Sequence, residues 1–172
     1  LKIKKNLRIL KFSKDQIPKN NQTSTKSIMG GLLVQDNDDS EEKTENWISV
    51  TKNTPSAEEY LDLKFAWKIC KHVKSNAIVV AKDQQTLGIG AGQMNRVGAS
   101  KIALEAAKKI GFGGVLASDG FFPFADTVQL ADKYGINSII QPGGSIRDEE
   151  SIKMCDSKGI SMIFTKKRHF LH

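Results

Sequence analysis

Residues 115–126 read VLASDGFFPFAD, an apolar run followed by three aromatic residues around a proline. The run at residues 115–117 predicts a short buried strand. Three aromatic side chains cannot all serve one core from a tight loop, and ligands of open α/β sheets usually bind at the carboxyl ends of strands. The loop is therefore interpreted in two ways. It is either the wall of a ligand site or a hydrophobic plug over the sheet, with Asp126 as the N-cap of the next helix.

Strand and helix patterns alternate from residue 76 to the end of the sequence. Apolar runs predict strands over residues 76–82, 87–91, 115–117, 137–141 and 160–164. Periodicity and end signals predict helices over residues 54–73, 97–110, 126–134 and 148–158. The close spacing of the first two strands predicts a hairpin. This alternation is typical of a layered α/β fold whose sheet is mixed and mostly parallel.

The amino-terminal third of the sequence lacks this alternation. Short β-prone runs predict strands over residues 7–12, 28–36 and 47–51, and the polar residues 13–26 predict a loop. An acidic segment, residues 36–45, is interpreted as a solvated loop, because it lacks the regular ligand spacing of a calcium loop.

Composition excludes several classes of protein. Hydrophobic residues make up 39% of the 172 residues and charged residues 26%, as in an ordinary globular domain. Residues 1–26 contain eight basic residues and one acid, which accounts for the whole net charge of +7. A basic leader on a neutral domain does not predict nucleic-acid binding. No apolar run is long enough to span a membrane, and no secretory leader opens the sequence. We therefore expect a cytoplasmic protein with reduced, buried cysteines.

Hydrogen-bond donors gather before one predicted helix. Gln93, Asn95 and Arg96 follow the glycine-rich residues 88–92 and precede helix 97–110. Donors at a helix start suit an anion, although Asn95 also fits a simple N-cap and Arg96 a surface ion pair. The run is not a dinucleotide fingerprint, because Gln93 stands where that motif needs glycine or alanine. Its small residues are expected to let a ligand or another strand approach closely.

The anion-binding turns are expected at one edge of the sheet, after residues 77–81, 115–117 and 137–141. The residues themselves predict an anionic, ring-bearing ligand contacted by Arg96, the 121–126 loop and Ser145. No nucleophile–base pair or metal set identifies a reaction. His72, at the end of helix 54–73, is either a general base or a side chain favoured by the helix dipole.

Five motifs resemble the C-terminal, AICAR transformylase part of the bifunctional purine-biosynthesis family. They are SNAIV at residues 75–79, GIGAGQMNR at 88–96, SDGFFPFAD at 118–126, QPGGSIRD at 141–148 and RHFLH at 168–172. The resemblance extends to GGLLVQD at 30–36 and FAWK at 65–68. It implies a three-layer α/β/α, cytidine-deaminase-like fold. The expected division is residues 1–54 as preceding strands and loops, and residues 55–172 as the second such subdomain. Gly120, where the family commonly has alanine, is a small departure.

The same resemblance implies a reaction and its ligands. The family transfers a formyl group from 10-formyltetrahydrofolate to the amine of 5-aminoimidazole-4-carboxamide ribonucleotide (AICAR) in de novo purine biosynthesis. Its members need no zinc, and their active sites are shared across a homodimer. Asn76, Arg96, Phe121 and Arg168 match positions that contact AICAR. Val97, Asp126, Ile146 and, again, Arg168 match positions that contact the folate. Asp119 falls near a structural potassium site.

The family's catalytic Lys-His pair, which is followed by Asn-Pro, has no counterpart here. Lys71-His72 is followed by a different sequence, so the resemblance assigns no catalytic residue and places the pair upstream of Leu1. We expect these 172 residues to be half of a formyltransferase that is inactive alone. The full-length protein would also be an IMP cyclohydrolase. The alternative is a ligand-binding or dimerisation module without chemistry.

Overall fold

The computed structural model describes residues 8, 10–13, 15, 23–38 and 43–171. The chain divides into two compact units, Leu1–Glu42 and Lys43–His172. Of the strand expected over residues 7–12, the described residues 8 and 10–12 are not in a strand. The division of the chain at residue 54 into transformylase segments stays a prediction.

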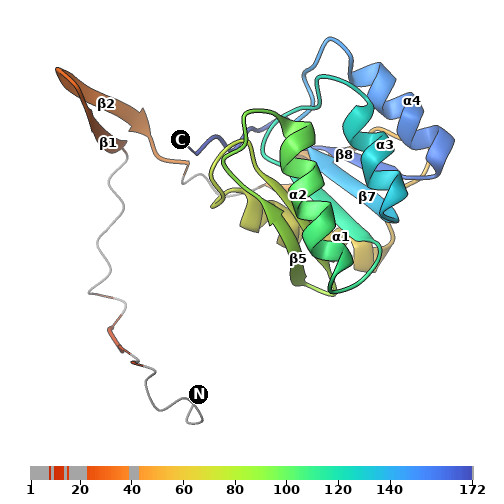
Figure 1. Ribbon diagram of the computed structural model, residues 1–172, viewed down its shortest axis with the longest axis horizontal. Helices are drawn as coiled ribbons and strands as arrows, with labels where there is room; N and C mark the ends of the chain where they lie inside the picture. Colours follow the sequence, from red (N-terminus) through yellow and green to blue (C-terminus); the bar gives the residue numbers. More distant parts are fainter. Residues whose placement is uncertain (1–7, 9, 14, 16–22, 39–42, 172) are drawn as a thin grey trace. The chain divides into compact units, whose positions relative to one another are not determined.

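The first unit contains an antiparallel hairpin of β1 (Thr23–Ile28) and β2 (Gly31–Asp36) (Figure 1). The prediction of one strand over residues 28–36, preceded by a loop, is wrong here. Gly30 adopts a φ of +80°, which turns the chain within the segment expected to be straight. The glycine pair therefore makes a turn and begins the second strand.

The second unit is built on a six-stranded mixed sheet with the order β3–β8–β7–β6–β4–β5. Its strands are β3 (Ile48–Ser49), β4 (Ile78–Lys82), β5 (Gln85–Gly90), β6 (Gly114–Ser118), β7 (Ile136–Gln141) and β8 (Ser161–Phe164). The β6–β7 and β7–β8 pairs are parallel, and the β3–β8, β4–β5 and β4–β6 pairs are antiparallel. The predicted hairpin is β4–β5.

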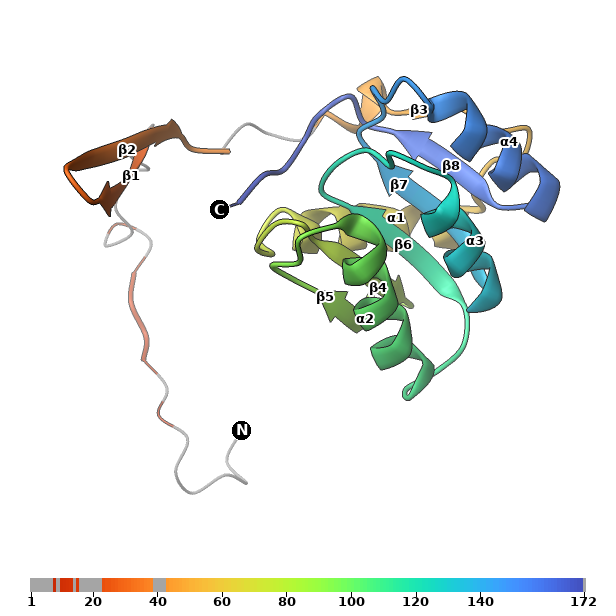
Figure 2. The same ribbon diagram turned by 45° about the horizontal axis from the view of Figure 1, so that its top comes forward.

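Helices cover both faces of this sheet, as Figure 2 shows. They are α1 (Ala57–Cys70), α2 (Arg96–Lys108), α3 (Asp126–Lys133) and α4 (Asp148–Lys158), and a short 3-10 helix, η2, spans Thr44–Asn46. Helix α1 packs on β4, β6 and β7 from one side, and α2, α3 and α4 form the opposite layer. The three-layer α/β/α prediction is confirmed. A capping box between Ser56 and Glu59 fixes the start of α1, where the sequence predicted a helix start.

Alternation along the central strands produces two cores. On β4, Ile78 and Val80 join the core beneath α2, α3 and α4, whereas Val79 and Ala81 join the core beneath α1. Leu116 of β6 lies in the first core, and its neighbours along the strand lie in the second. The strand period of two explains why these strands read as continuous apolar runs.

The glycines of β5 were expected to let a ligand or another strand approach closely, but they have a different packing role. A Cβ at Gly88 would lie 2.0 Å from the carbonyl oxygen of Ala103, and one at Gly90 would lie 1.9 Å from that of Ala99. Both carbonyls belong to α2. Because these two glycines have no side chains, α2, which begins with Arg96, lies directly against the sheet. The segment that approaches the glycines is therefore this helix.

Strand directions determine which segments share an edge. Because β4 is antiparallel to β6, its carboxyl end lies at the opposite edge, so the prediction that the turn after residues 77–81 joins the site is wrong. The hairpin returns the chain through β5, which runs in the same direction as β6, β7 and β8. The edge of interest therefore combines the amino end of β4 with the carboxyl ends of these four strands.

Both cysteines are free and fully buried. Burial raises the pKa of Cys155 to about 12 from an ordinary value of 9.0, and raises the pKa of Cys70 well above that value, with the charge of Asp119 adding to the shift. Since the unfolded chain ionises these thiols first, their contribution to stability is complete below about pH 9 and is lost at higher pH, in the case of Cys155 as the pH rises toward 12.

We expect the free energy of unfolding to fall by about 1.4 kcal/mol per pH unit for each thiol in that window. Denaturant titrations between pH 8 and 11, with Cys155→Ala as the comparison, measure this slope. A thiol reagent should leave the native chain unlabelled at pH 8. Rapid labelling of the folded chain would contradict the assignment.

Within the described part of the chain, none of the helices combines the length and the apolar character that a bilayer span requires.

Candidate functional site

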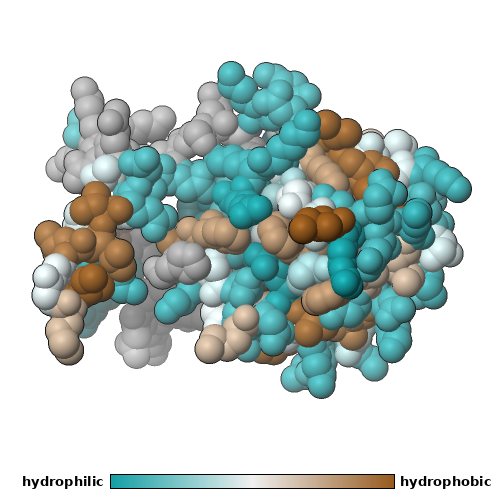
Figure 3. Space-filling model, turned by 90° about the horizontal axis from the view of Figure 1, so that it is seen from above, coloured by the Kyte–Doolittle hydropathy of each residue, from teal (hydrophilic) through white to brown (hydrophobic). Residues whose placement is uncertain are grey.

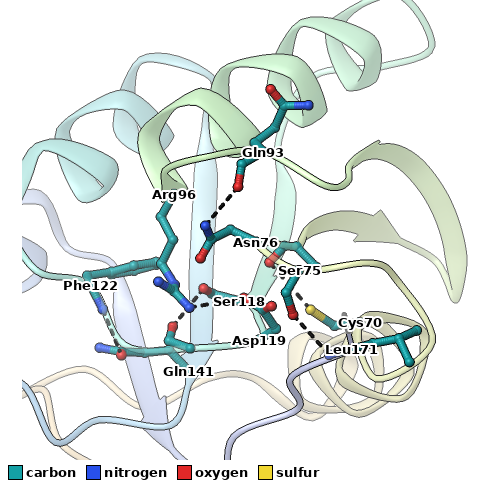
Figure 4. A network of polar contacts seen from close by, with 12 residues as sticks. Cys70, Ser75, Asn76, Gln93, Arg96, Ser118, Asp119, Phe122, Gln141 and Leu171 are labelled. Carbon is teal, nitrogen blue, oxygen red and sulfur yellow. Dashed lines mark hydrogen bonds and ion pairs between the residues drawn. The ribbon is translucent and has the colours of Figure 1, made fainter. Parts of the chain in front are cut away.

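Four segments that are distant in sequence meet at the edge described above (Figure 4). Asn76, just before β4, donates from its backbone N–H and its side-chain Nδ2 to the carbonyl of Gln93, at 3.2 and 2.8 Å. Asp119, just after β6, donates its N–H to Ala77, and its own carbonyl accepts from the N–H of His169. These bonds join the start of β4, the segment after β5, the end of β6 and the carboxyl-terminal tail.

A buried ion pair lies at the centre of this edge. The Nη2 atom of Arg96 lies 3.3 Å from Oδ1 of Asp119, whose side chain is fully buried. Burial lowers the pKa of the Arg96 guanidinium from its ordinary value, and the Asp119 carboxylate opposes that shift. The pair uses one contact only, because Nε of Arg96 and Oδ2 of Asp119 are buried without a hydrogen-bond partner. Arg96 therefore keeps donors that a ligand could engage.

One further arginine, Arg168, and two phenylalanines, Phe121 and Phe170, lie around the pair. The Cζ atom of Arg168 lies 4.9 Å from the ring centroid of Phe121 and 5.8 Å from that of Phe170. The corresponding distances from Arg96 are 6.0 and 5.9 Å. Two positive charges around an aromatic face fit an anion that carries a flat ring. The structure thus brings together three of the predicted AICAR-contacting residues, and places the fourth, Asn76, just before β4, the strand that adjoins β6.

The aromatic loop provides the expected hydrophobic plug, while its role as the wall of a ligand site stays a prediction. The expectation that Asp126 is the N-cap of the next helix is wrong, because Ala125 holds that position and Asp126 is the first residue of α3. Phe122 is fully buried in the core beneath α2, α3 and α4, whereas Phe124 is 49% exposed and Phe121 is partly buried beside the arginines. Gln141 holds the loop, since its Oε1 accepts from the N–H of Phe122 at 3.3 Å and of Gly143 at 3.2 Å. One phenylalanine is the plug, and its neighbours face outward at the edge.

The carboxyl-terminal tail folds back over the same edge. The ring of His169 packs against Trp67 of α1 in a tilted arrangement, with 4.5 Å between centroids and 47° between the ring planes, and is almost fully buried. Ser75 and Leu171 exchange two hydrogen bonds, at 2.8 and 3.0 Å. These contacts position Arg168 and Phe170. His169 and Trp67 lie within the quoted motifs RHFLH and FAWK, but their contact was not predicted, because it joins segments that are far apart in the sequence.

Two of the predicted folate-contacting residues line one groove between α2 and α3. The groove has a volume of about 370 Å³, and its lining is Val97, Gly98, Lys101, Asp126, Gln129, Leu130 and Lys133. Asp126 is exposed, and its Oδ1 accepts from the N–H of Thr127 at 2.7 Å at the start of α3. Ile146 is fully exposed in the neighbouring turn, where Arg147 stacks on Phe124 at 4.8 Å.

Asp119 was also expected near a potassium site. Its fully buried Oδ2 lacks a hydrogen-bond partner, and an oxygen of this kind is a suitable ligand for an alkali cation. Among the described residues, however, no cluster of three or more His, Cys, Asp or Glu side chains accompanies it. The potassium site therefore stays a prediction.

Other candidates lie away from the arginines. His72 is exposed after α1 and donates its backbone N–H to Ile69, as expected for a helix end. A polar cavity of about 530 Å³ lies beside the amino ends of β7 and β8. Its lining is Lys52, Asn53, Thr54, Glu59, Asn137, Gly159 and Ser161, and it includes none of the predicted site residues.

Gly120 supplies the space in which the Arg96 guanidinium lies. A Cβ at this position would be 1.8 Å from Nη2 of Arg96 and 3.0 Å from the Phe170 ring. Because the clash involves the end of a flexible side chain, we expect Gly120→Ala to change the free energy of unfolding by less than about 1 kcal/mol. A crystal structure of the variant should show the Arg96 guanidinium shifted away from the new methyl group while it remains paired with Asp119. An unmoved guanidinium beside the new methyl group would contradict this account.

Comparison with known proteins gives consistent matches. A family model described as "AICARFT/IMPCHase bienzyme" matches residues 1–106. A bifunctional purine biosynthesis protein PurH from Prochlorococcus marinus subsp. pastoris, strain MED4, is 84% identical over 172 residues, which is 100% of this chain and 33% of that protein. The PurH of strain NATL1A is 61% identical over 169 residues, or 98% of the chain and 33% of that protein. The chain spans about a third of the length of these relatives.

Proposed function

The chain belongs to the AICARFT/IMPCHase bienzyme family, and from this premise we propose that it supplies one half of an AICAR formyltransferase site in purine biosynthesis. The single observation that carries the proposal is the arrangement around Phe121, where the guanidinium groups of Arg96 and Arg168 converge from α2 and from the tail. The sequence motifs of the resemblance supply the residues, and the fold gathers them at one edge.

In this proposal Arg96, Arg168 and Phe121 bind AICAR. The guanidinium groups engage the nucleotide's phosphate or carboxamide oxygens through charge-assisted hydrogen bonds, and the phenylalanine packs against its five-membered ring. Asn76 contacts the nucleotide from the start of β4, where Gln93 already holds its amide group.

Asp126 binds the folate. Its carboxylate pairs with the amino–amide edge of the pterin through two hydrogen bonds, and Val97, in the same groove, packs against the ring. Ile146 contacts the cosubstrate from the neighbouring turn. These roles orient 10-formyltetrahydrofolate beside the nucleotide, so that proximity contributes to the rate.

The transfer itself needs groups outside these 172 residues. The AICAR amine attacks the formyl carbon, the bond from that carbon to the folate nitrogen breaks, and the proton lost by the amine is returned to that nitrogen. The amine is a poor nucleophile because its lone pair is delocalised, so a base must remove its proton and a cation must stabilise the oxyanion. We assign this base and cation to the remainder of the full-length protein, which we propose to be a homodimer.

Formyl transfer by the full-length protein tests the proposal directly. With AICAR and 10-formyltetrahydrofolate, we expect the full-length protein to release tetrahydrofolate, and the 172-residue chain alone to show no turnover. A folded full-length protein without turnover would favour the alternative, a binding module of the same fold. Turnover by the isolated chain would contradict the assignment of the catalytic groups to the remainder.

A further inference from the structure

The side chain of Gln141 is fully buried at the end of β7, at the edge where the proposed ligand-contacting segments meet. Its Oε1 atom accepts hydrogen bonds from the backbone N–H groups of Phe122, at 3.3 Å (Figure 4), and of Gly143, at 3.2 Å. Its Nε2 atom lies 3.5 Å from the sulfur atom of Met162 in β8. An amide oxygen has two acceptor positions, and both are used here. One atom of this side chain therefore joins two loops.

The two loops carry residues that the proposed function assigns to different ligands. The N–H group of Phe122 belongs to the peptide that links this residue to Phe121, the residue assigned to the AICAR ring. Gly143 begins the turn that leads to Ile146, which is assigned to the folate. Because β7 lies beside β6 in the sheet, a side chain at the end of β7 reaches the loop that follows β6.

The turn after β7 has few other anchors. Gly143 and Gly144 have no side chains, and Ile146 is fully exposed. Figure 3 views the second unit from the side of these loops and shows apolar groups exposed there among polar ones. An exposed apolar side chain gains no burial energy that could hold its own loop. The orientation of the turn therefore depends on backbone hydrogen bonds such as the one from Gly143 to Gln141.

The backbone at the same position holds the start of the carboxyl-terminal tail. The carbonyl oxygen of Gln141 accepts from the N–H group of Thr165, and that of Pro142 accepts from the N–H group of Lys166, both at 3.0 Å. These bonds fix the chain just before Arg168, which is assigned to both ligands. The end of β7 thus contacts three segments that carry proposed ligand-binding residues.

We propose that Gln141 is a positioning residue that couples the AICAR and folate parts of the site. The inference rests on the proposed function, because it uses the ligands assigned there. Since both N–H groups bind the same oxygen atom, a displacement of the Phe121 loop also moves the acceptor of Gly143. A bound nucleotide, which fixes Phe121, therefore orders the turn that carries Ile146, and each ligand favours the binding of the other.

Steady-state kinetics of Gln141→Met in the full-length protein tests this role. Methionine is similar in size but offers no strong acceptor, so two buried N–H groups lose their partner and both loops shift. We expect the KM for AICAR and the KM for 10-formyltetrahydrofolate each to rise about tenfold, because both ligands are misplaced. A merely structural role would lower the amount of folded enzyme, which reduces the apparent kcat and leaves both KM values unchanged. Gln141→Glu keeps an oxygen at the position of Oε1 and should restore both KM values toward those of the unmodified protein.

Ser138→Ala is the matched control. Ser138 is also fully buried in β7, and its Oγ atom lies 2.6 Å from that of Ser161, nearer the amino end of the strand. The variant loses a buried hydrogen bond without affecting the acceptor of the two loops. It should therefore leave both KM values unchanged, even where it lowers stability.

Amide hydrogen exchange of the unmodified full-length protein gives a measurement that does not depend on the folding of a variant. AICAR alone, without folate, should slow exchange both in residues 119–125 and in the turn at residues 143–146. An effect confined to residues 119–125, or a folded Gln141→Met in which fewer than two of the KM values rise, would overturn the inference while turnover by the unmodified protein upholds the proposed function. Absence of turnover by the unmodified protein would reject the proposed function and this inference with it, so the two failures are distinguishable.

Discussion

Replacing Arg96 by methionine in the full-length protein is expected to lower kcat/KM for formyl transfer by about 100-fold. The guanidinium is placed to make charge-assisted hydrogen bonds to AICAR, each of which contributes roughly 1.5–3 kcal/mol, and methionine makes none of them. Because the residue contacts the nucleotide in this account, the KM for AICAR should rise, while that for 10-formyltetrahydrofolate changes little. Steady-state kinetics with each substrate varied in turn measures the two effects.

The same substitution also affects folding, and the two effects must be separated. Arg96→Met leaves the carboxylate of Asp119 buried without its positive partner, which costs about 3–5 kcal/mol of stability in comparable cases. The double variant Arg96→Met/Asp119→Asn removes that unpaired charge and should recover most of the stability but none of the activity. Arg147→Met is the matched control, because Arg147 is half exposed and lies beside Phe124. Recovery of turnover in the double variant would show that Arg96 acts only through the fold.

Replacing Asp126 by asparagine is expected to raise the KM for 10-formyltetrahydrofolate by about 100-fold, with a smaller effect on AICAR. Asparagine offers one acceptor and one donor where the carboxylate offers two acceptors, so one of the two hydrogen bonds to the pterin edge becomes a clash of donors. Asp126 is exposed and has no ion-pair partner within the described residues, so the stability of the variant should be nearly unchanged.

Glu150 provides the comparison for this prediction. It lies in the first turn of α4 and is 55% exposed, and among the described residues its one ion-pair partner is Arg147, so Glu150→Gln should leave both KM values close to those of the unmodified protein. Equal effects of Asp126→Asn on the two substrates, or no effect on the folate, would contradict the assignment of the pterin to the groove between α2 and α3.

Much of the fold follows from local patterns in the sequence. The apolar runs of β4, β6, β7 and β8 and the helix signals of α1–α4 predict elements close to those observed, because each depends on nearby residues. The sheet order and the antiparallel direction of β6 relative to β4 depend on contacts between distant segments. For that reason the sequence placed the turn after β4 at the wrong edge.

The residues of the site were predictable as a set, but their arrangement was not. Motifs identify Arg96 and Phe121, yet nothing local indicates that Arg96 pairs with a carboxylate 23 residues later, in the space left by Gly120. Phe121 and Phe122 are identical in chemistry and adjacent in sequence. Only the sheet, through Gln141, decides that Phe122 is buried while Phe121 remains at the edge.

A crystal structure of the full-length protein with bound AICAR would test the central claim most directly. The account predicts the nucleotide at the edge formed by the carboxyl ends of β5–β8, with its ring against Phe121 and its anionic oxygens bound by Arg96 and Arg168. A nucleotide bound away from these three residues, for example in the polar cavity near Asn137 and Ser161, would contradict it.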